Sequence, residues 1–251
     1  MEVDYIKCCD CVEGMRMLPD GCIDLTVTSP PYGDMREYNG YSLDTESLIR
    51  ELYRVTREGG AVVWVMGDQT KNGDESGDSF KTALTFKSIG FKLFDTMIYQ
   101  KSQACFGSNR GYLQSFEYMF VFSKGRLKTS NLIRDRKNVR PGIQSATKSG
   151  MGKDGKIPER IMMDAKKYGK RKNVWTYGVG GGKTGHPAVF PYDLARDHII
   201  SWSNEGDLVL DPMCGSGTTL LAAKNLGRHY IGMDCSEEYC LMSESRVNGR
   251  L

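Results

Sequence analysis

The stretch Leu-Val-Leu-Asp-Pro-Met-Cys-Gly-Ser-Gly-Thr-Thr at residues 208–219 is the part of the sequence that decides the fold. An apolar run that ends at Asp211 leads into a turn with two glycines and then into a helical pattern. This order predicts a strand, a tight turn and the start of a helix. The lack of a Cβ atom at Gly215 and Gly217 lets a ligand approach the backbone, and helix N-termini carry unpaired N–H groups. Open α/β sheets bind ligands at the carboxyl ends of their strands, so we expect a binding turn here.

A second acidic residue follows this turn. Tyr230–Met233 is a short apolar run that ends in Asp234. A carboxylate at such a position, about 20 residues after a glycine turn, is well placed to accept the two hydroxyls of a ribose. The pair of features predicts a cofactor that contains adenosine. Leu220 replaces the third glycine of the dinucleotide fingerprint, which disfavours NAD.

Short apolar runs and amphipathic runs alternate along the chain, which predicts an α/β layout. We expect strands at Asp4–Cys8, Ile23–Thr28, Ala61–Met66, Lys92–Tyr99, Glu117–Phe122, Leu208–Leu210 and Tyr230–Met233. We expect helices at Asp44–Arg57, Tyr192–Trp202 and Thr218–Leu226, and a surface loop at Gln69–Ser79.

Composition excludes several classes of protein. The 251 residues are 39% hydrophobic and 26% charged, which fits a globular chain rather than a disordered or collagen-like one. No run approaches the roughly 20 apolar residues that a membrane span requires, and the start does not read as a signal peptide. Eight cysteines in such a chain suggest reduced thiols in the cytoplasm. Cys8 and Cys9 are adjacent and would point to opposite sides of a strand, so we expect no metal site.

Positive charge is concentrated in one segment. Residues 124–172 hold 16 Lys and Arg against 4 Asp and Glu, whereas the remainder holds 18 basic and 27 acidic residues. Such a patch offers a footprint to a polyanion, and nucleic acid is the commonest one. A solvated charged surface is the plainer alternative. We expect a basic insert at 124–185, between a first half at 1–123 and a second half at 186–251.

The strand at Ile23–Thr28 runs directly into Ser29-Pro30-Pro31-Tyr32. Two prolines fix φ and donate no N–H, so the turn is rigid. It can aim two acceptors, the Ser29 hydroxyl and the Pro30 carbonyl, toward one amine. Tyr32 adds an aromatic face on which a planar base can stack. A strand terminator with a packed tyrosine is the structural alternative.

Together, Thr-Ser-Pro-Pro-Tyr at 28–32 and Asp-Pro-Met-Cys-Gly-Ser-Gly-Thr-Thr at 211–219 resemble the motifs of the β-group of DNA amino-methyltransferases. In that permuted group the catalytic motif precedes the cofactor motif, as here, and the resemblance covers nearly the whole chain. It implies an α/β, Rossmann-like class I methyltransferase fold with a mostly parallel seven-stranded sheet, one antiparallel strand and a circularly permuted motif order. It also implies S-adenosylmethionine as cofactor, double-stranded DNA as partner, and target recognition by the basic insert.

The resemblance also implies site residues. The catalytic candidates are Ser29, Pro30, Pro31 and Tyr32. The cofactor-binding candidates are Asp10, Cys11, Ser29, His186, Phe190, Asp211, Met213, Cys214, Gly215, Ser216, Gly217, Thr218 and Asp234. The DNA-binding candidates are Arg134, Arg136, Lys137, Arg140, Lys170, Arg171 and Lys172. The chain departs from the family pattern at Met213, where phenylalanine is usual, and at Cys9, where glycine is usual.

Within the family, a serine at the first position of this turn is typical of enzymes that methylate cytosine N4, and aspartate is typical of adenine N6. We therefore expect a site-specific cytosine-N4 methyltransferase that acts on a flipped base. Adenine N6, structured RNA as the substrate, and a binding protein with a degenerate cofactor pocket are the alternatives. A homodimer and a separate cognate restriction endonuclease, as in restriction-modification pairs, are open expectations.

Overall fold

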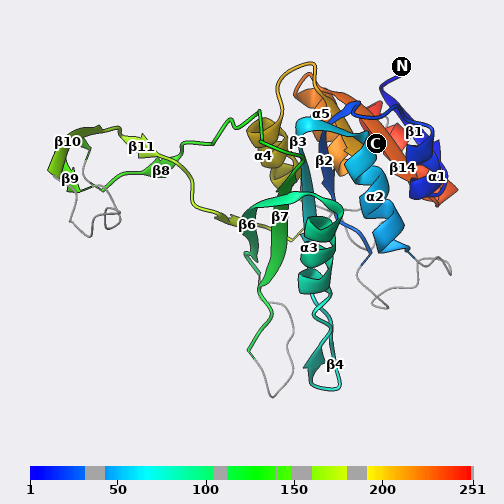
Figure 1. Ribbon diagram of the computed structural model, residues 1–251, viewed down its shortest axis with the longest axis horizontal. Coiled ribbons are helices and arrows are strands. Elements are labelled where there is room, and N and C mark those ends of the chain that lie inside the picture. Colours follow the sequence, from blue (N-terminus) through cyan, green and yellow to red (C-terminus); the bar gives the residue numbers. More distant parts are fainter. Residues whose placement is uncertain (32–42, 104–111, 140, 148–159, 180–190, 250–251) are drawn as a thin grey trace. The chain divides into compact units, whose positions relative to one another are not determined.

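A large mixed sheet organises most of the chain (Figure 1). The computed structural model describes residues 1–31, 43–103, 112–139, 141–147, 160–179 and 191–249. Within these ranges the strands of the sheet are β1 (Tyr5–Cys8), β2 (Ile23–Thr28), β3 (Thr56–Met66), β6 (Lys92–Lys101), β7 (Phe116–Ser123), β12 (Val174–Tyr177), β13 (Leu208–Asp211) and β14 (His229–Asp234). The helices are α1 (Cys11–Arg16), α2 (Thr45–Val55), α3 (Asp78–Ile89), α4 (Tyr192–Trp202), α5 (Thr218–Asn225) and α6 (Glu237–Val247).

The strand order is β1-β14-β13-β2-β3-β7-β6-β12, and β7 is the one described strand of this sheet that runs antiparallel to its neighbours. The expected α/β fold with a mostly parallel sheet and one antiparallel strand is confirmed. All seven predicted strands are present, and β12 makes an eighth. We did not predict β12 because its four residues lie in a stretch rich in Gly and Lys. Trp175 fixes it, since its side chain is 6% exposed and its ring centroid lies 4.7 Å from that of His198.

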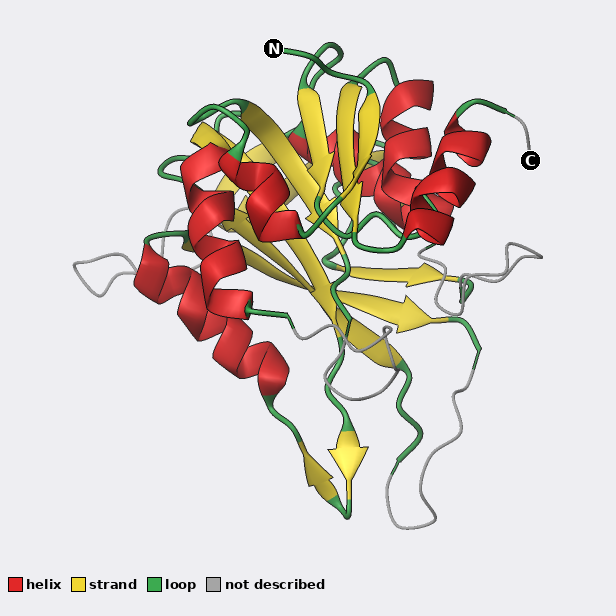
Figure 2. Ribbon diagram, turned by 90° about the vertical axis from the view of Figure 1, so that its right-hand side faces the viewer, coloured by secondary structure: helices red, strands yellow, loops and turns green. Residues whose placement is uncertain are grey.

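Helices cover both faces of the sheet, as Figure 2 shows. The core on one face joins α1, α2 and α3, and the core on the other joins α4, α5 and α6. Alternate residues of β3 pack into the two cores: Trp64 lies in the first core, and Val63 and Val65 lie in the second. This double burial is typical of parallel sheets and explains why their strands are continuously apolar. None of the helices in the described part of the chain has the length and apolar character that crossing a bilayer requires.

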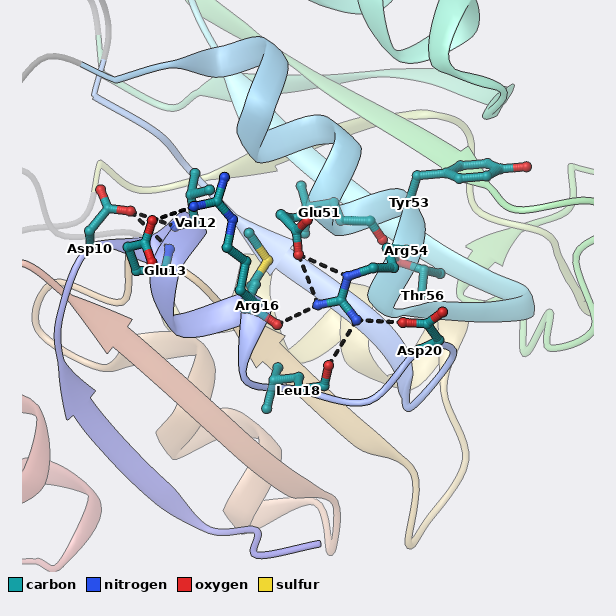
Figure 3. Close-up of polar contacts among 12 residues, drawn as sticks. Asp10, Val12, Glu13, Arg16, Leu18, Asp20, Glu51, Tyr53, Arg54 and Thr56 are labelled. Carbon is teal, nitrogen blue, oxygen red and sulfur yellow. Dashed lines mark hydrogen bonds and ion pairs between the residues drawn. The ribbon is translucent and has the colours of Figure 1, made fainter.

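Arg54, near the end of α2, ties that helix to α1 (Figure 3). Its guanidinium donates to the carbonyl oxygens of Met15 at 2.6 Å and Leu18 at 2.8 Å, which belong to the last turn of α1 and the residues after it. It also pairs with the carboxylates of Glu51 and Asp20. The last carbonyls of a helix lack partners within the helix, and Arg54 supplies a donor to one of them, Met15 O, while its bond to Leu18 O holds the chain just after α1.

Three helices, α1, α3 and α6, were not predicted from the sequence. Helix α1 spans six residues, too few for a periodic pattern, and α6 is mostly polar. Helix α3 starts at the end of the predicted loop Gln69–Ser79, in which β4 (Thr70–Lys71) pairs with β5 (Asp74–Glu75). The cap of α3 comes from Asp68, whose carboxylate accepts the Ser79 N–H at 2.9 Å across eleven positions. A capping contact that is so distant in sequence leaves no local signal.

Residues 132–172 form a second compact unit, separate from the unit of residues 1–131 and 173–251. It contains two antiparallel pairs, β8 (Arg136–Lys137) with β11 (Tyr168–Gly169) and β9 (Gly142–Thr147) with β10 (Arg160–Ala165). We call this unit the β-arm. The predicted division at 1–123, 124–185 and 186–251 stays a prediction.

The residues that flank the β-arm are held by the larger unit. Asn131 donates its backbone N–H to Ser201 O at 2.8 Å, at the end of α4. Asn173 accepts the N–H of Ile98 from β6 at 2.8 Å and donates its side-chain amide to Thr96 O at 3.2 Å. The chain therefore leaves the larger unit and re-enters it at two anchored positions.

His198 on α4 is fully buried. Its Nδ1 accepts the indole N–H of Trp202 at 3.1 Å, and its Nε2 lies 3.2 Å from the sulfur of Met119 on β7. Burial lowers the pKa of His198 to about 3, although the neighbouring carboxylate of Asp197 opposes the shift. The ring is therefore neutral and serves packing between α4 and the sheet.

We predict that His198 makes the protein sensitive to acid. Its pKa in the unfolded chain is about 6.5, so the unfolded state binds a proton that the folded state excludes as the pH falls from about 6.5 toward 3. The free energy of unfolding falls over this window. His198→Gln has no group that titrates at this position, so its free energy of unfolding should not show this loss. The difference in free energy of unfolding between wild type and His198→Gln should therefore narrow by up to roughly 1.4 kcal/mol per pH unit below 6.5. Urea unfolding at pH 7.5, 6.0 and 5.0 measures it, with His198→Phe as a second non-titrating variant; parallel profiles would contradict the prediction.

Candidate functional site

Four parallel strand ends meet at one edge of the sheet. Cys8 of β1 pairs with Asp234 of β14, Gly232 of β14 pairs with Asp211 of β13, and β13 pairs in turn with β2. The segments 9–11, 29–31 and 211–218, which contain most of the described candidate residues of the catalytic and cofactor sites, therefore lie at the ends of neighbouring strands. The pairing of β13 with β2 brings the glycine turn side by side with the Ser-Pro-Pro turn, although the two lie some 180 positions apart in the chain.

A buried hydrogen bond joins these two turns. Thr28, the last residue of β2, donates its hydroxyl to Asp211 Oδ1 at 2.8 Å. Asp211 is 5% exposed and also accepts the backbone N–H of Met213 at 3.2 Å. The Thr219 hydroxyl lies within reach of both this carboxylate and Val27 O, at 3.2 Å from the latter, so its single proton is shared between two acceptors. Burial raises the pKa of Asp211 to about 6, an effect that the donors from Thr28, Thr219 and Met213 partly offset.

The glycine turn has the backbone shape that its sequence predicts. Gly215 and Gly217 have positive φ of 49° and 75°, a region that favours glycine. Glycine at position 217 was expected because it lets a ligand approach the backbone, and the structure shows a second reason. A Cβ atom there would lie 2.1 Å from Ser243 Oγ on α6, so the missing side chain makes room for a helix of the protein as well as for a backbone turn.

The side chains of the turn are mostly inside the protein. Asp211, Cys214, Ser216 and Thr218 are each 3–6% exposed, whereas Met213 is half-buried. A ligand at this edge would therefore meet chiefly the backbone of the turn and the side chain of Met213. Burial also raises the pKa of the Cys214 thiol far above its ordinary value, which keeps it protonated.

Asp234 braces the turn from the neighbouring strand. Its Oδ2 accepts the N–H of Gly215 at 2.9 Å, and its Oδ1 accepts the N–H of Ser236 at 2.9 Å. The Cys214 N–H donates to Met233 O at 2.8 Å, which holds the turn against the end of β14. A carboxylate offers about four acceptor positions. These contacts use one on each oxygen, so the half-buried carboxylate fits a role in accepting two ribose hydroxyls.

Asp10 has a structural task at this edge (Figure 3). It is the N-cap of α1, and its Oδ1 accepts the N–H groups of Val12 at 2.9 Å and Glu13 at 3.0 Å. The Cys9 N–H donates to Asp234 O at 2.9 Å, so Asp10 lies next to the Asp234 strand end. Cys11 is 7% exposed, and burial raises its pKa to about 12, so it packs as a small apolar residue.

The Ser-Pro-Pro turn leaves the end of β2 beside these residues. Pro30 is buried, and Ser29 and Pro31 are half-buried. Three other candidates, Tyr32, His186 and Phe190, lie outside the described residues. In the described ranges, no three His, Cys, Asp or Glu side chains come together in an arrangement that would hold a metal ion.

The DNA-binding candidates gather on the β-arm, where most are exposed. Those with exposed side chains are Arg134, Arg136, Lys137, Lys170 and Lys172. Arg171 is different because its guanidinium pairs with the carboxylate of Asp135, which lowers the pKa of Asp135. Arg140 lies outside the described residues. Arg171 therefore supports the fold of the β-arm, and its charge is partly neutralised.

Sequence reasoning missed the residues that hold the turns. Thr28, Thr219 and Arg246 each bond to the candidate turn, yet none was a candidate. Thr28 and Thr219 adjoin the two motifs, so their position was a usable signal. Arg246 lies on α6, which was not predicted, and nothing local in the sequence indicates its contact.

Comparison with known proteins gives a consistent result. A family model for DNA methylases, N6_N4_Mtase, matches residues 23–245. The orphan methyltransferase M.BamHII of Bacillus amyloliquefaciens is 51% identical over 237 residues, which cover 91% of this chain and 89% of that protein. The PvuII DNA methyltransferase, described as cytosine-N4-specific, superposes with a TM-score of 0.72 at 18% identity, covering 98% of this chain and 86% of that one. A putative DNA modification methylase from Thermus thermophilus, complexed with S-adenosyl-L-methionine, has a TM-score of 0.68 at 22% identity, covering 99% and 96%. These two structures share the fold.

We predict that removing the Thr28 hydroxyl destabilises the protein in a pH-dependent way. The folded-state pKa of Asp211 is about 6 against an ordinary 3.8, so ionising this buried carboxylate weakens the fold as the pH rises from about 3.8 to 6. Thr28→Val removes a donor to the ionised form. Its cost should therefore be small at pH 5 and reach roughly 1–3 kcal/mol at pH 7.5. Urea unfolding at both pH values, with Thr28→Ser as the control that keeps the hydroxyl, measures it; an equal cost at both values would refute the role of the bond.

Proposed function

Because the chain belongs to the DNA methylase family of N6 and N4 amino-methyltransferases, we propose that it methylates the N4 amine of a cytosine within a specific sequence of double-stranded DNA. The protein is a DNA methyltransferase that uses S-adenosylmethionine. The placement of Ser29 and Pro30 beside the strand end of Asp211, through the pairing of β2 with β13 and the bond from Thr28, supports methylation of an exocyclic amine. The serine at position 29 supports cytosine N4 as that amine.

The cofactor site that we propose is the edge formed by β1, β14 and β13. Bound S-adenosylmethionine supplies an electrophilic methyl group on a cationic sulfonium. Asp234 accepts ribose hydroxyls with the acceptor positions that Gly215 and Ser236 leave, and the backbone of the turn contacts the rest. Met213 gives an apolar wall in place of the usual phenylalanine. Asp10 and Cys11 lie at the adenine end, and His186 and Phe190 stay candidates for the methionine end.

The catalytic step that we propose relies on hydrogen-bond acceptors. The lone pair of an exocyclic amine is delocalised into its ring, which makes the nitrogen a poor nucleophile. The Ser29 side-chain oxygen and the Pro30 carbonyl accept its two N–H groups and favour a tetrahedral nitrogen with a localised lone pair. The nitrogen then forms a bond to the methyl carbon as the sulfur–carbon bond breaks, which leaves the sulfur as a neutral thioether. The methylated nitrogen is then cationic and releases one proton to water. Proximity supplies most of the acceleration.

The target base has to leave the duplex before its amine can reach this turn. We propose that Tyr32, next to Pro31 in the sequence, stacks on the flipped base. The serine at position 29 supports cytosine, since its family resemblance is to N4 enzymes. The same donor and acceptor geometry accommodates adenine N6, and the product of the reaction distinguishes the two bases.

The negative charge of the site suits a cationic donor. Above about pH 6 Asp211 is ionised, and it lies within the field of Asp234 on the adjacent strand end. Two carboxylates at the edge of a sheet lower the free energy of a bound cation more than that of a neutral molecule. We propose that this field favours S-adenosylmethionine over the uncharged thioether that remains after transfer.

We predict N4-methylcytosine as the product. Purified protein, unmodified duplex DNA and S-adenosylmethionine should yield this nucleoside on enzymatic digestion and mass spectrometry. Ser29→Ala loses one acceptor for the amine and should lower kcat at saturating cofactor roughly tenfold or more, about 1.4 kcal/mol or more in barrier. Ser88→Ala on the exposed face of α3 is the control. N6-methyladenine as the product, or transfer to RNA in preference to duplex DNA, would overturn the substrate assignment.

We also predict that the β-arm carries the DNA contacts. The variant replaces its exposed basic side chains by glutamine, namely Arg134, Arg136, Lys137, Lys170 and Lys172. Each phosphate contact that is lost should reduce the slope of log K against log salt by roughly 0.9. Fluorescence anisotropy from 50 to 300 mM salt (roughly the range over which such binding weakens) measures the slope. Arg16→Gln with Arg50→Gln, exposed arginines of the larger unit, is the matched control; an unchanged slope in the β-arm variant would exclude this surface.

A further inference from the structure

Arg246 in the last turn of α6 reaches the glycine turn from behind. Its Nη1 lies 2.6 Å from Ser216 O, 2.8 Å from Ser216 Oγ and 3.2 Å from Thr218 Oγ1. One guanidinium nitrogen thus bonds to both residues on either side of Gly217. Ser243, one helical turn earlier on α6, occupies the space that a side chain at position 217 would need.

In the described part of the chain, the Arg246 guanidinium donates only to polar atoms of the glycine turn, namely those of Ser216 and Thr218. Among the described residues it forms no ion pair with a carboxylate, and burial lowers its pKa from the ordinary value. A partly buried charge without an acidic partner costs folding free energy, which hydrogen bonds can offset. By contrast, Arg16 on α1 and Arg50 on α2 are exposed, and each pairs with a glutamate on its own helix.

The turn has one internal backbone hydrogen bond, from the Gly217 N–H to Cys214 O at 2.8 Å, but no side chain of its own caps the helix that follows. Gly217 is the N-cap of α5 and has no side chain with which to accept the first N–H groups of that helix. Asp234 holds the turn at the Gly215 N–H, and Arg246 holds it at the Ser216 carbonyl. The two contacts fix consecutive residues, one by its donor and the other by its acceptor.

We propose that Arg246 is a positioning residue for S-adenosylmethionine binding, which holds the backbone of residues 215–218 in the conformation that contacts the cofactor. The inference rests on the proposed cofactor site at this turn. It assigns the C-terminal helix a direct task in cofactor affinity, although no atom of Arg246 is required to touch the ligand. The consequence is specific: loss of Arg246 weakens the cofactor complex, and the methyl-transfer step at saturating cofactor is preserved.

The test measures the Kd for S-adenosylmethionine by calorimetry for wild type, Arg246→Lys and Arg246→Ala. A lysine can make one of these bonds but lacks the planar fork, so we expect Kd to rise about tenfold for Ala, which corresponds to about 1.4 kcal/mol, and by less for Lys. The value of kcat at saturating cofactor and the Kd for DNA should stay within about twofold of wild type. Arg50→Ala, which removes an exposed arginine of α2, is the matched control.

Chemical rescue separates positioning from general stability. Millimolar guanidinium chloride should restore cofactor affinity to Arg246→Ala in a saturable way, whereas equal sodium chloride should not. Affinity in Arg246→Ala within twofold of wild type would overturn the inference. So would an affinity loss that follows the loss of folded protein in circular dichroism and is not restored by guanidinium. Failure of the wild-type protein itself to bind S-adenosylmethionine would instead overturn the cofactor site.

Discussion

The parallel pairing of β2 with β13 is the constraint on which the site depends. It places the ends of two strands, 183 positions apart in the chain, within one hydrogen bond of each other, and the Thr28–Asp211 bond closes that distance at 2.8 Å. The bond is buried, and its acceptor is a carboxylate whose pKa burial raises to about 6. A hydrogen bond to a buried, ionised carboxylate is stronger than a hydrogen bond between neutral groups. Leaving such a carboxylate without a donor lowers the free energy of unfolding. The geometry of the two turns is therefore tied to the stability of the core.

Much of this arrangement could be predicted from the sequence, because strands that are buried on both faces are rich in apolar and β-branched residues. β2 and β13 begin at the predicted residues, and the glycine turn follows as expected. The pattern does not contain the contacts between distant elements. The cap on α3 comes from Asp68, and the reason for Gly217 lies in Ser243 on a helix that shows no clear period. Sequence identified the residues of the turns, and tertiary contacts determine how those turns are held.

The β-arm illustrates a second limit. Two-stranded ribbons have little core of their own and are marginally stable alone. Here the described ladders are short, and Asn131 and Asn173 of the larger unit anchor the two ends of the segment. Its composition predicted an interaction surface, because exposed charge has a signal in the sequence that pairing register lacks. The composition could not reveal that Arg171 pairs with Asp135 within the same unit.

The distribution of charge connects these two parts of the function. The chain outside residues 124–172 has 18 basic and 27 acidic residues, and the edge that we propose for the cofactor carries Asp10, Asp211 and Asp234. Such a body repels phosphates and attracts a sulfonium cation, whereas the basic segment has the opposite preference. A single surface could not bind both ligands well, because each carboxylate that attracts the sulfonium cofactor also repels the phosphates of duplex DNA. Placing the 16 basic residues in one segment removes that conflict. At the edge where we propose that the cofactor binds, burial raises the pKa of Asp211 to about 6, and the Thr28 hydroxyl opposes that shift by donating to the carboxylate, so Asp211 keeps its negative charge above about pH 6.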